Sequence, residues 1–444
     1  MLYLTGSRDD MNSIIRQIAM ISRINRSQWK DRSYFTNLQN RGISKLINYA
    51  YENNGFYKKK LDRSGIKPGD INTIDDLRKL PVTTRQELQE TGREELISRS
   101  YIDRNKNIIL TTSGTTHMPL QILLSRQDQY IKEAHWLRIL KQWGIRIKDK
   151  RFCIAGQNIV GLPKSWHRYL HLYSKEFCTI FKDQDEIFES FIKCEPNIVT
   201  GFTGAILILA KMVEDNRNAV KKYPKLVSTT SQMLYDDERE YIQTVFKAGV
   251  MDVYATTENG FIAWECNKHE GYHVDAENVI VEFLKDNEPV SAGELGDIIV
   301  TNLNSYAMPF IRYKTGDMGI RKEGVCSCGR GLPLMGKVMG RRGDFIKTPA
   351  GSIFSPHIIS SIMKNIKGIK QYQVVQRSID KLIVMIKKDK EDIRDIEQQI
   401  ETEFRKTLGQ DIEILVSEVD GFNKNNELKT RRIFSQVDLN DGGY

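Results

Sequence analysis

The spacing of hydrophobic residues changes along the chain and predicts a series of different regions. Residues 40–66 carry apolar side chains at helical spacing, so we expect the first hundred residues to be mainly helical. Thr84 stands directly before the charged stretch 85–90, in the position of a helix N-cap. Beyond residue 107, short apolar runs alternate with amphipathic stretches. This alternation is typical of a mixed or parallel sheet covered by helices.

The alternating region and the region after it are predicted element by element. The short apolar runs predict strands at 107–110, 151–156, 197–202, 225–230 and 251–257. The stretches between them predict helices at 127–144, 203–216 and 236–249. From about residue 278 the helical pattern stops, and strands are expected at 278–284, 296–303 and 309–317. We therefore expect a smaller β-rich subdomain at about 278–340.

The C-terminal hundred residues predict a separate compact domain. A helix at 355–366, strands at 371–376 and 381–387, a second helix and a strand at 411–419 give an αββαβ order. The second helix keeps one apolar face, and Gly409 follows it as a C-terminal cap; the face consists of Ile393, Ile396, Ile400, Phe404 and Leu408. The sequence thus predicts a large α/β domain of layered sheets and helices at 1–340, and a small α+β domain at 341–444.

Length and composition agree with an ordinary globular protein of more than one domain. The chain has 444 residues, of which 40% are hydrophobic and 28% charged. No run approaches the roughly 20 apolar residues of a membrane span. The start lacks the basic region, apolar stretch and cleavage site of a secretory signal. We therefore expect a cytoplasmic protein that does not bind a membrane.

The charge of the chain is basic but diffuse. There are 66 Lys and Arg against 57 Asp and Glu, a net charge of +9, without a block of like charges. No basic motif interleaved with aromatic residues is found, so we expect no nucleic-acid partner. A small anionic substrate suits this charge equally well. Nucleic-acid binding stays as an alternative that predicts steeply salt-dependent association.

Residues 110–122 form a loop rich in hydroxyl groups after a predicted strand. The segment LTTSGTTHMPLQI offers backbone N–H groups and hydroxyls that can surround phosphate oxygens, and Gly114 allows a close approach. It has no Gly-Lys-Ser/Thr ending, which excludes a Walker loop. By composition alone, a surface loop that only solvates itself is an equal alternative.

Three further segments follow this loop in a fixed order. In 253–260, Tyr254 can stack on a base and Glu258 can hold Mg²⁺ at a strand end. In 313–319, Asp317 can accept hydrogen bonds from the two hydroxyls of a ribose. Near the C-terminus, Lys429 lies in the basic segment 426–433. Each segment alone also fits a strand-end turn or a solvated basic run, and it is their order that points to nucleotide chemistry.

These segments, in this order, resemble the adenylate-forming superfamily of acyl-CoA synthetases. Within it the chain is most similar to the phenylacetate-coenzyme A ligase family, including its capsular-polysaccharide-cluster relatives. Residues 49–88 are similar to that family's opening, and 263–273 to its segment after the Tyr-Glu motif. The resemblance implies an ATP-dependent reaction in two steps. A carboxylate first displaces pyrophosphate to form an acyl-adenylate, and a thiol or amine then displaces AMP.

The resemblance also implies roles for individual residues. Thr257 would contact the α-phosphate, Glu258 would coordinate Mg²⁺, and Asp317 with Arg341 would bind the ribose. The β- and γ-phosphates would be held by the hydroxyl loop, through Thr112, Ser113, Gly114, Thr115 and Thr116.

The C-terminal domain would contribute a lysine and a hinge. Lys429 would stabilise the charge that develops during adenylation, and Arg431 and Arg432 are alternatives for this role. Asp344, in the Gly-Arg motif, would be the pivot about which a mobile C-terminal domain swings between the two half-reactions.

The chain departs from the family pattern at three places. His117 stands where the phosphate loop usually continues with glycine, and Ala255 replaces a glycine ahead of the Thr-Glu pair. Ser231 and Gln232 would face the adenine in place of a Gly-Ala-Glu segment. These departures keep open a second alternative, a catalytically inactive nucleotide-binding protein.

Four residues of the β-rich region predict a structural zinc site. Cys266, His273, Cys326 and Cys328 can supply three thiolates and one imidazole, which complete a tetrahedron without a water position. His269 is an alternative to His273. The other interpretation is four reduced, partly buried residues without a metal. The three remaining cysteines, Cys153, Cys178 and Cys194, are interpreted as packing residues.

The resemblance thus implies an ATP-dependent, Mg²⁺-dependent ligase that makes a coenzyme A thioester of an aryl or otherwise small carboxylic acid. Candidate residues of the acid pocket are Phe202, Gly204 and Phe261. An alternative keeps the first step but transfers the acyl group to an amine, a sugar or a carrier-protein thiol during capsule or natural-product assembly. A homodimer would be usual for the resembled family.

Overall fold

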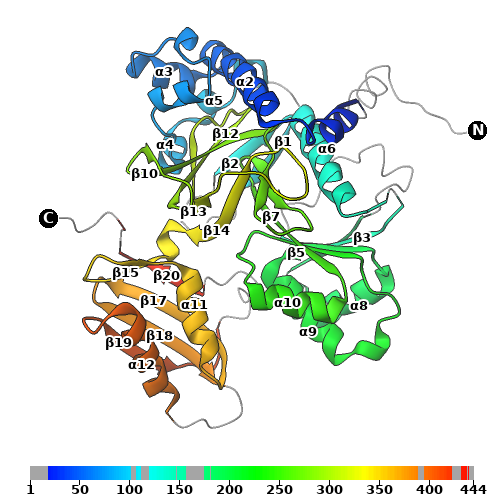
Figure 1. Cartoon of the computed structure of the whole chain (residues 1–444), viewed down its shortest axis with the longest axis vertical. Helices are drawn as coiled ribbons and strands as arrows, with labels where there is room; N and C mark the ends of the chain where they lie inside the picture. The colour runs from blue at the N-terminus through cyan, green and yellow to red at the C-terminus, as the bar shows by residue number, and fades with distance from the viewer. Residues whose placement is uncertain are drawn as a thin grey trace, which may run out of the picture. The chain divides into compact units, whose positions relative to one another are not determined.

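The described residues form two compact units (Figure 1). The computed structural model describes residues 19–101, 107–111, 120–146, 148–156, 175–180, 182–388, 395–422, 432–437 and 439. One unit comprises Met1–Thr315 and Ile320–Lys337, and the other Gly316–Gly319 and Val338–Tyr444. The expected domain boundary at residue 341 stays a prediction. Within the described ranges, none of the helices has the length and apolar character needed to cross a membrane.

Two capped helices follow each other near the start of the first unit. Helix α2 (Arg32–Asn53) ends where α3 (Gly55–Arg63) begins, because the Asn54 side chain accepts a hydrogen bond from the backbone N–H of Tyr57 and caps α3. The helical spacing at 40–66 therefore belongs to two successive helices. Short helices follow: η1 (Pro68–Asp70), η2 (Asp75–Lys79), α4 (Arg85–Glu90), α5 (Arg93–Leu96) and η3 (Arg99–Tyr101). The predicted cap at Thr84 is confirmed, with Glu87 completing a capping box.

The centre of the first unit is the parallel part of a large mixed sheet. Its neighbouring strands are β4 (Lys175–Thr179), β3 (Arg151–Ala155), β5 (Ile198–Phe202), β6 (Leu226–Thr230) and β7 (Gly249–Thr256), all parallel. The connecting helices are α6 (Arg126–Gln142), α8 (Gln184–Cys194), α9 (Thr203–Asp215) and α10 (Asp236–Phe246), with η5 (Arg217–Ala219) after α9. Figure 1 shows α8, α9 and α10 grouped beside these strands. The expected helix-covered parallel sheet is confirmed.

The sheet continues without a break into an antiparallel part. Its strands are β8 (Gly260–Glu265), β9 (Tyr272–Val274), β10 (Val279–Lys285), β11 (Glu288–Pro289), β12 (Leu295–Asn302), β13 (Tyr313–Arg321) and β14 (Leu334–Arg341). The order across the sheet is β11-β10-β12-β13-β14-β9-β8-β7-β6-β5-β3-β4. The β-rich region is therefore an extension of the central sheet. A separate antiparallel pair, β1 (Ile108–Thr111) and β2 (Gln121–Leu124), flanks residues 112–119.

One predicted strand begins later in the chain than expected. The strand expected at 309–317 begins only at Tyr313, because Pro309 lacks an N–H donor and Arg312 has a left-handed backbone with φ of 47°. The guanidinium of Arg312 forms an ion pair with Glu282 at 2.9 Å. This arrangement leads the chain into β13.

The second unit is a small sheet covered by two helices. The elements after η6 (Arg342–Asp344) are β15 (Ile346–Lys347), β16 (Ile353–Phe354), α11 (Pro356–Asn365), β17 (Ile369–Ser378), β18 (Lys381–Lys388), α12 (Ile396–Leu408), β19 (Glu413–Glu418) and β20 (Ile433–Ser435). The sheet order is β19-β18-β17-β20. The predicted αββαβ order is confirmed, and β20 is an additional parallel strand on β17.

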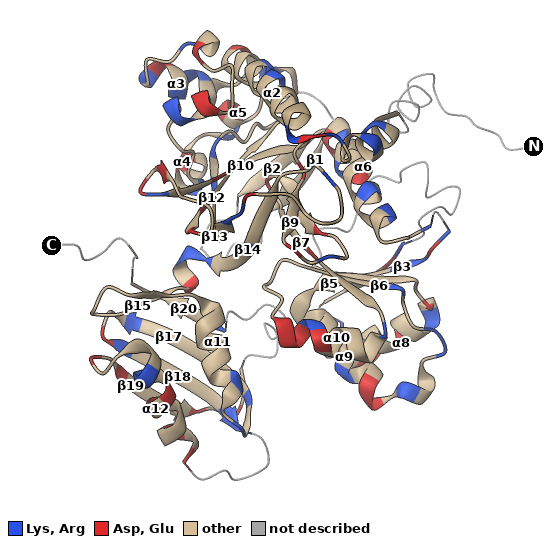
Figure 2. Ribbon diagram, in the orientation of Figure 1, with Lys and Arg blue, Asp and Glu red and all other residues tan. Residues whose placement is uncertain are grey.

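The apolar face predicted for α12 packs into the core of this unit. Ile396, Ile400, Phe404 and Leu408 are buried, and the N–H of Gly409 bonds to the carbonyl of Arg405 at the end of the helix. Ile393 lies outside the described residues. Figure 2 shows Lys and Arg positions interspersed with Asp and Glu positions along the ribbon of both units.

Candidate functional site

The carboxyl ends of the central parallel strands bring several of the predicted site residues to one edge of the sheet. Phe202 ends β5, Ser231 and Gln232 follow β6, and Thr257 and Glu258 follow β7. In open α/β sheets, ligands bind outside the carboxyl ends of the strands. This edge is the candidate nucleotide site.

The turn after β7 is held in place by the hydrogen bonds of Asn259. The backbone N–H and the side-chain amide of Asn259 both donate to Oγ1 of Thr256, at 3.1 and 3.3 Å. The carbonyl of Asn259 accepts from the side-chain amides of Asn302, at 3.0 Å, and Asn278, at 3.4 Å. Gly260 closes the turn with a φ of 70°, a value that glycine adopts without strain. Thr257 and Glu258 therefore lie in a turn whose backbone is held by these hydrogen bonds.

Glu258 is buried and has a tyrosine partner. Its side chain accepts a hydrogen bond from the hydroxyl of Tyr313, which lies 3.0 Å from Oε1. A guanidinium nitrogen of Arg85 lies 3.9 Å from the same oxygen. Carboxylate oxygens are ligands that Mg²⁺ prefers, so the residue type fits the predicted metal role. Neither Tyr313 nor Arg85 was predicted as a site residue, since neither lies near Glu258 along the chain.

The residues predicted to surround the base lie on neighbouring strands. The hydroxyl of Tyr254 donates to Oγ1 of Thr315 at 3.3 Å. Oε1 of Gln232 accepts from the backbone N–H of Gly204 at 2.8 Å, which joins the end of β6 to the start of α9. Ser231 has a left-handed backbone with φ of 68°, where the chain turns after β6. The structure thus brings the predicted base contact Gln232 against the predicted pocket residue Gly204.

The aromatic pocket candidate Phe261 packs against a tryptophan. Its ring stacks on Trp136 of α6, with centroids 5.1 Å apart and planes inclined by 11°. Phe202 is half-buried at the end of β5. Their role in binding an acid stays a prediction.

The predicted ribose and hinge residues lie together in the second unit. Nε of Arg341 is 3.9 Å from Oδ1 of Asp317, so the predicted helper is beside the predicted ribose ligand. The carboxylate of Asp344 accepts from the backbone N–H of Arg341 at 3.2 Å and caps η6 where β14 ends. The predicted pivot is therefore the last residue of a short turn directly after a strand.

Several predicted residues lie outside the described residues. They are the hydroxyl loop Thr112, Ser113, Gly114, Thr115 and Thr116, together with His117, Lys429 and Arg431. Arg432 is described, and its guanidinium lies 5.9 Å from the ring centre of Tyr372.

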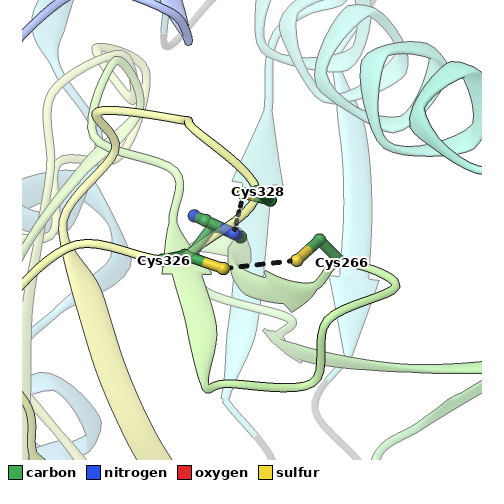
Figure 3. Close-up of side chains that lie close together, drawn as sticks. Cys266, Cys326 and Cys328 are labelled. Carbon is green, nitrogen blue, oxygen red and sulfur yellow. Dashed lines mark hydrogen bonds between the residues drawn. The ribbon is translucent and has the colours of Figure 1, made fainter.

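The four predicted zinc ligands converge on one point. One ligand atom from each of Cys266, His273, Cys326 and Cys328 lies within 4.8 Å of the other three (Figure 3). The sulfurs of Cys266 and Cys326 are 3.6 Å apart, and the Cys328 sulfur is 3.4 Å from Nε2 of His273. Bond lengths of about 2.3 Å to sulfur and about 2.05 Å to nitrogen would put two tetrahedral sulfur ligands about 3.8 Å apart, and a sulfur and a nitrogen about 3.6 Å apart. The observed spacings therefore fit a tetrahedral ion.

The alternative ligand His269 is directed elsewhere. Its Nδ1 lies 3.6 Å from a carboxylate oxygen of Glu265 and 3.3 Å from a guanidinium nitrogen of Arg239. Among the described residues, the group that could hold a metal ion contains His273 and not His269.

The protonation chemistry of the cluster suits a metal ligand set. Burial lowers the pKa of His273 to about 4, so the imidazole is neutral and its nitrogen can coordinate. Burial raises the pKa of Cys326 to about 12 and also raises that of Cys266. Burial also opposes ionisation of Cys328, but hydrogen bonds from Arg330 outweigh it and lower the pKa of that thiol. Three thiols this close need a cation before all of them can ionise.

Comparison with known proteins gives a consistent picture over most of the chain. Residues 346–436 match the family described as CapK C-terminal domain. The chain is 23% identical over 358 residues to Protein CapK of Staphylococcus aureus, covering 79% of this chain and 77% of that protein. It is also 23% identical over 337 residues to the phenylacetate-coenzyme A ligase of Escherichia coli strain K12, covering 74% of this chain and 76% of the relative.

A solved structure shares the fold. The crystal structure of 2-hydroxyisobutyryl-CoA ligase in the postadenylation state, in complex with R3-HIB-AMP, superposes with a TM-score of 0.77. The two chains are 18% identical, and the superposition covers 93% of this chain and 91% of the ligase. At this identity the likeness shows the fold, a large α/β body followed by a small C-terminal domain.

Proposed function

We propose that the chain is an AMP-forming acid–thiol ligase of the adenylate-forming superfamily, because it is similar to phenylacetate-coenzyme A ligases and to Protein CapK over most of its length. It activates a small carboxylic acid with ATP and transfers the acyl group to coenzyme A. Phenylacetate-coenzyme A ligases from Thermus thermophilus and Escherichia coli are among the relatives that support this reaction class.

The observation that carries the proposal is the hydrogen-bonded turn after β7. It holds Thr257 and the buried carboxylate of Glu258 at the carboxyl edge of the parallel strands, where nucleotides bind in sheets of this type. Asn259 fixes this turn through both its side chain and its backbone. A turn held in this way is preorganised for charge that develops in a transition state.

The first half-reaction is substitution at phosphorus. A carboxylate oxygen of the acid forms a bond to the α-phosphorus of ATP, and the bond from that phosphorus to pyrophosphate breaks. Thr257 contacts the α-phosphate, Glu258 carries a magnesium ligand, and Lys429 stabilises the developing charge. Mg²⁺ would neutralise phosphate charge when bound. The hydroxyl loop 112–116 holds the phosphates that leave.

The second half-reaction is acyl transfer. The thiolate of coenzyme A attacks the acyl carbon, the bond from that carbon to the AMP oxygen breaks, and a thioester and AMP are formed. Asp317 and Arg341, 3.9 Å apart, hold the ribose. Asp344 is the pivot of the C-terminal domain between the two steps.

A different acyl acceptor remains a second candidate. Residues 346–436 match a domain family described by CapK, and Protein CapK is similar over 358 residues. In this version the adenylate forms as above, and an amine, a sugar hydroxyl or a carrier-protein thiol displaces AMP.

A structural zinc ion is part of the proposal. The ligand spacing at Cys266, His273, Cys326 and Cys328 supports it, and the four protein ligands leave no position for a reacting water. The ion would join β9 and the loop before it to the loop before β14, two strands that are neighbours in the sheet. The cytoplasmic location and the homodimer expected from the sequence stay predictions.

The test is exchange of labelled pyrophosphate into ATP, which depends on the first half-reaction alone. The purified full chain is assayed with aryl, fatty, hydroxy and amino acids, each with and without coenzyme A. We expect exchange with a few related acids, and formation of AMP and thioester when coenzyme A is added. Exchange without a thioester would favour the second candidate. No exchange with any acid, from protein that binds ATP, would favour a nucleotide-binding protein without this activity.

A further inference from the structure

A lysine of helix α6 lies against the turn that carries Thr257 and Glu258. Nζ of Lys132 donates to the backbone carbonyl of Thr257 at 3.4 Å. The methylene groups of the same side chain cover Gly260. A Cβ at position 260 would lie 2.8 Å from Cε of Lys132, so the lysine occupies the space that the glycine leaves. The turn and the lysine are packed directly on each other.

Helix α6 holds this lysine between two fixed contacts. At its start, Oγ of Ser125 accepts from the N–H of Asp128, and the Asp128 carboxylate accepts from the N–H of Ser125 at 2.7 Å. One helical turn beyond Lys132, the ring of Trp136 stacks on Phe261, the second residue of β8. The backbone of Lys132 is therefore anchored to the strand that leaves the turn.

The ammonium group lies among the charges of the candidate site. Its acidic neighbours are Asp128 on the same helix and Glu258 on the turn, and both favour its charged form. Burial acts in the opposite sense and is the larger effect, so the pKa of Lys132 is lowered to about 8. If only packing were needed at this position, an apolar residue could supply it without the cost of burying a charge.

The hydrogen bond to Thr257 has a geometric consequence for the next residue. A peptide unit is planar and trans, so its carbonyl and its N–H point in opposite directions. Holding the carbonyl of Thr257 toward Lys132 fixes the N–H of Glu258 away from α6. The same bond restricts rotation of the peptide that joins the two predicted contact residues.

We propose that Lys132 is a positioning residue for adenylation: it holds the Thr257 carbonyl so that Thr257 and Glu258 keep the orientation needed for the α-phosphate and its magnesium ion. This inference rests on the proposed function. Lys132 itself need not touch the substrate, and its effect is transmitted through the turn.

The experiment compares Lys132→Met, Lys132→Arg and the control Lys141→Met. Methionine keeps most of the alkyl chain that covers Gly260 but removes the hydrogen-bond donor and the positive charge. Arginine keeps the donor and the charge. Lys141 is exposed on the same helix, so its replacement tests for a general effect on α6. Two quantities are measured: kcat and KM for MgATP in pyrophosphate exchange, and amide hydrogen exchange of residues 254–261 without ligands.

We expect Lys132→Met to lower kcat by about tenfold to a hundredfold, the cost of a misplaced contact, with a smaller change in KM. Amide exchange at 254–261 should become severalfold faster and stay unchanged in α9 and α10. Lys132→Arg should recover much of the loss in kcat, and Lys141→Met should match the wild type.

Three results would overturn the inference: wild-type kcat and amide exchange in Lys132→Met, equal losses in the methionine and arginine variants, or faster exchange throughout α6 and β3, which would indicate a packing role. If the wild type exchanges no pyrophosphate with any acid, the proposed function fails. Amide exchange then still decides whether Lys132 holds the turn.

Discussion

The hydroxyl of Tyr313, the first residue of β13, donates to a carboxylate oxygen of Glu258 at 3.0 Å. The two residues are 55 positions apart in the sequence. This bond joins the antiparallel part of the sheet to the turn at the carboxyl edge of its parallel part. It determines where the carboxylate of Glu258 points.

Tyr313→Phe should therefore weaken adenylation without unfolding the protein. Removing the hydroxyl leaves the Glu258 carboxylate without that donor, and we expect an approximately tenfold loss of kcat/KM and a higher Mg²⁺ requirement. The loss of unfolding free energy should be about 1 kcal/mol. Pyrophosphate exchange at several Mg²⁺ concentrations and denaturant unfolding measure the two effects.

The matched control for this variant is Tyr241→Phe. The hydroxyl of Tyr241 on α10 also donates to a glutamate, Glu214, at 3.0 Å. Tyr241→Phe therefore removes the same type of hydrogen bond at a distance from the candidate site. An equal loss of activity in both variants would contradict the assigned role of Tyr313.

Glu258→Gln should abolish most Mg²⁺-dependent pyrophosphate exchange while the protein remains folded. The amide keeps the size of the side chain and can still accept from Tyr313, but it is a much poorer magnesium ligand. We expect a loss of at least about a hundredfold in kcat, similar to the removal of one transition-state contact. Glu240→Gln, at an exposed position of α10, is the control. Unchanged turnover in Glu258→Gln would remove this residue from the mechanism.

The cysteine and histidine cluster should retain about one zinc ion per chain through purification without added metal. Cys326→Ser should lower the bound zinc and the melting temperature together, because a structural ion stabilises the folded state. The control Cys194→Ser, at the end of α8, should change neither the bound zinc nor the melting temperature. Elemental analysis and thermal unfolding give the result. A wild-type protein that is free of zinc and insensitive to a chelator would contradict the site.

Asp252 should make the stability of the protein depend on pH. Burial, and then repulsion from Glu265, raise the pKa of this carboxyl from 3.8 to about 6. Between these values the folded state binds more protons than the unfolded state, so the unfolding free energy falls as the pH rises from about 4 to about 6. The contribution of this group is complete below pH 3.8 and is lost above pH 6.

The variant Asp252→Asn isolates this contribution because it does not titrate. The unfolding free energy of the variant, relative to wild type, should rise by about 2 kcal/mol between pH 4 and pH 7, slightly less than the full shift of about two pKa units because the unfolded carboxyl is already partly ionised at pH 4. Denaturant unfolding at matched pH values measures the difference. A constant difference across this range would show that Asp252 has an ordinary pKa.

The sequence predicted local structure well where burial repeats at a regular interval. The helix at α12 was identified by residues that recur every four positions, of which Ile396, Ile400 and Phe404 are buried in the structure. The strands β5 and β6 were identified as short apolar runs, and nearly all their residues are buried. Such patterns are visible without a fold because each element must cover a hydrophobic face.

The candidate site was predicted only in part. The order of the motifs indicated Thr257, Glu258 and Asp317, and the spacing of ligand types indicated the four residues of the metal cluster. Neither signal indicated Tyr313, Arg85 or Lys132, because an ordinary tyrosine, arginine or lysine has no local pattern that marks it. These residues meet the turn after β7 from β13, α4 and α6.

The sequence by itself determined the class of fold, the kind of chemistry and the residue types available for it. These depend on periodicity and on the order of short motifs, which are local properties. Only the tertiary structure decided that His273 and not His269 lies with the three cysteines, and that Lys132 and Tyr313 border the turn with Glu258. Contacts of this kind depend on how strands pair across the sheet, and strand pairing joins residues whose separation in the chain carries no signal of its own.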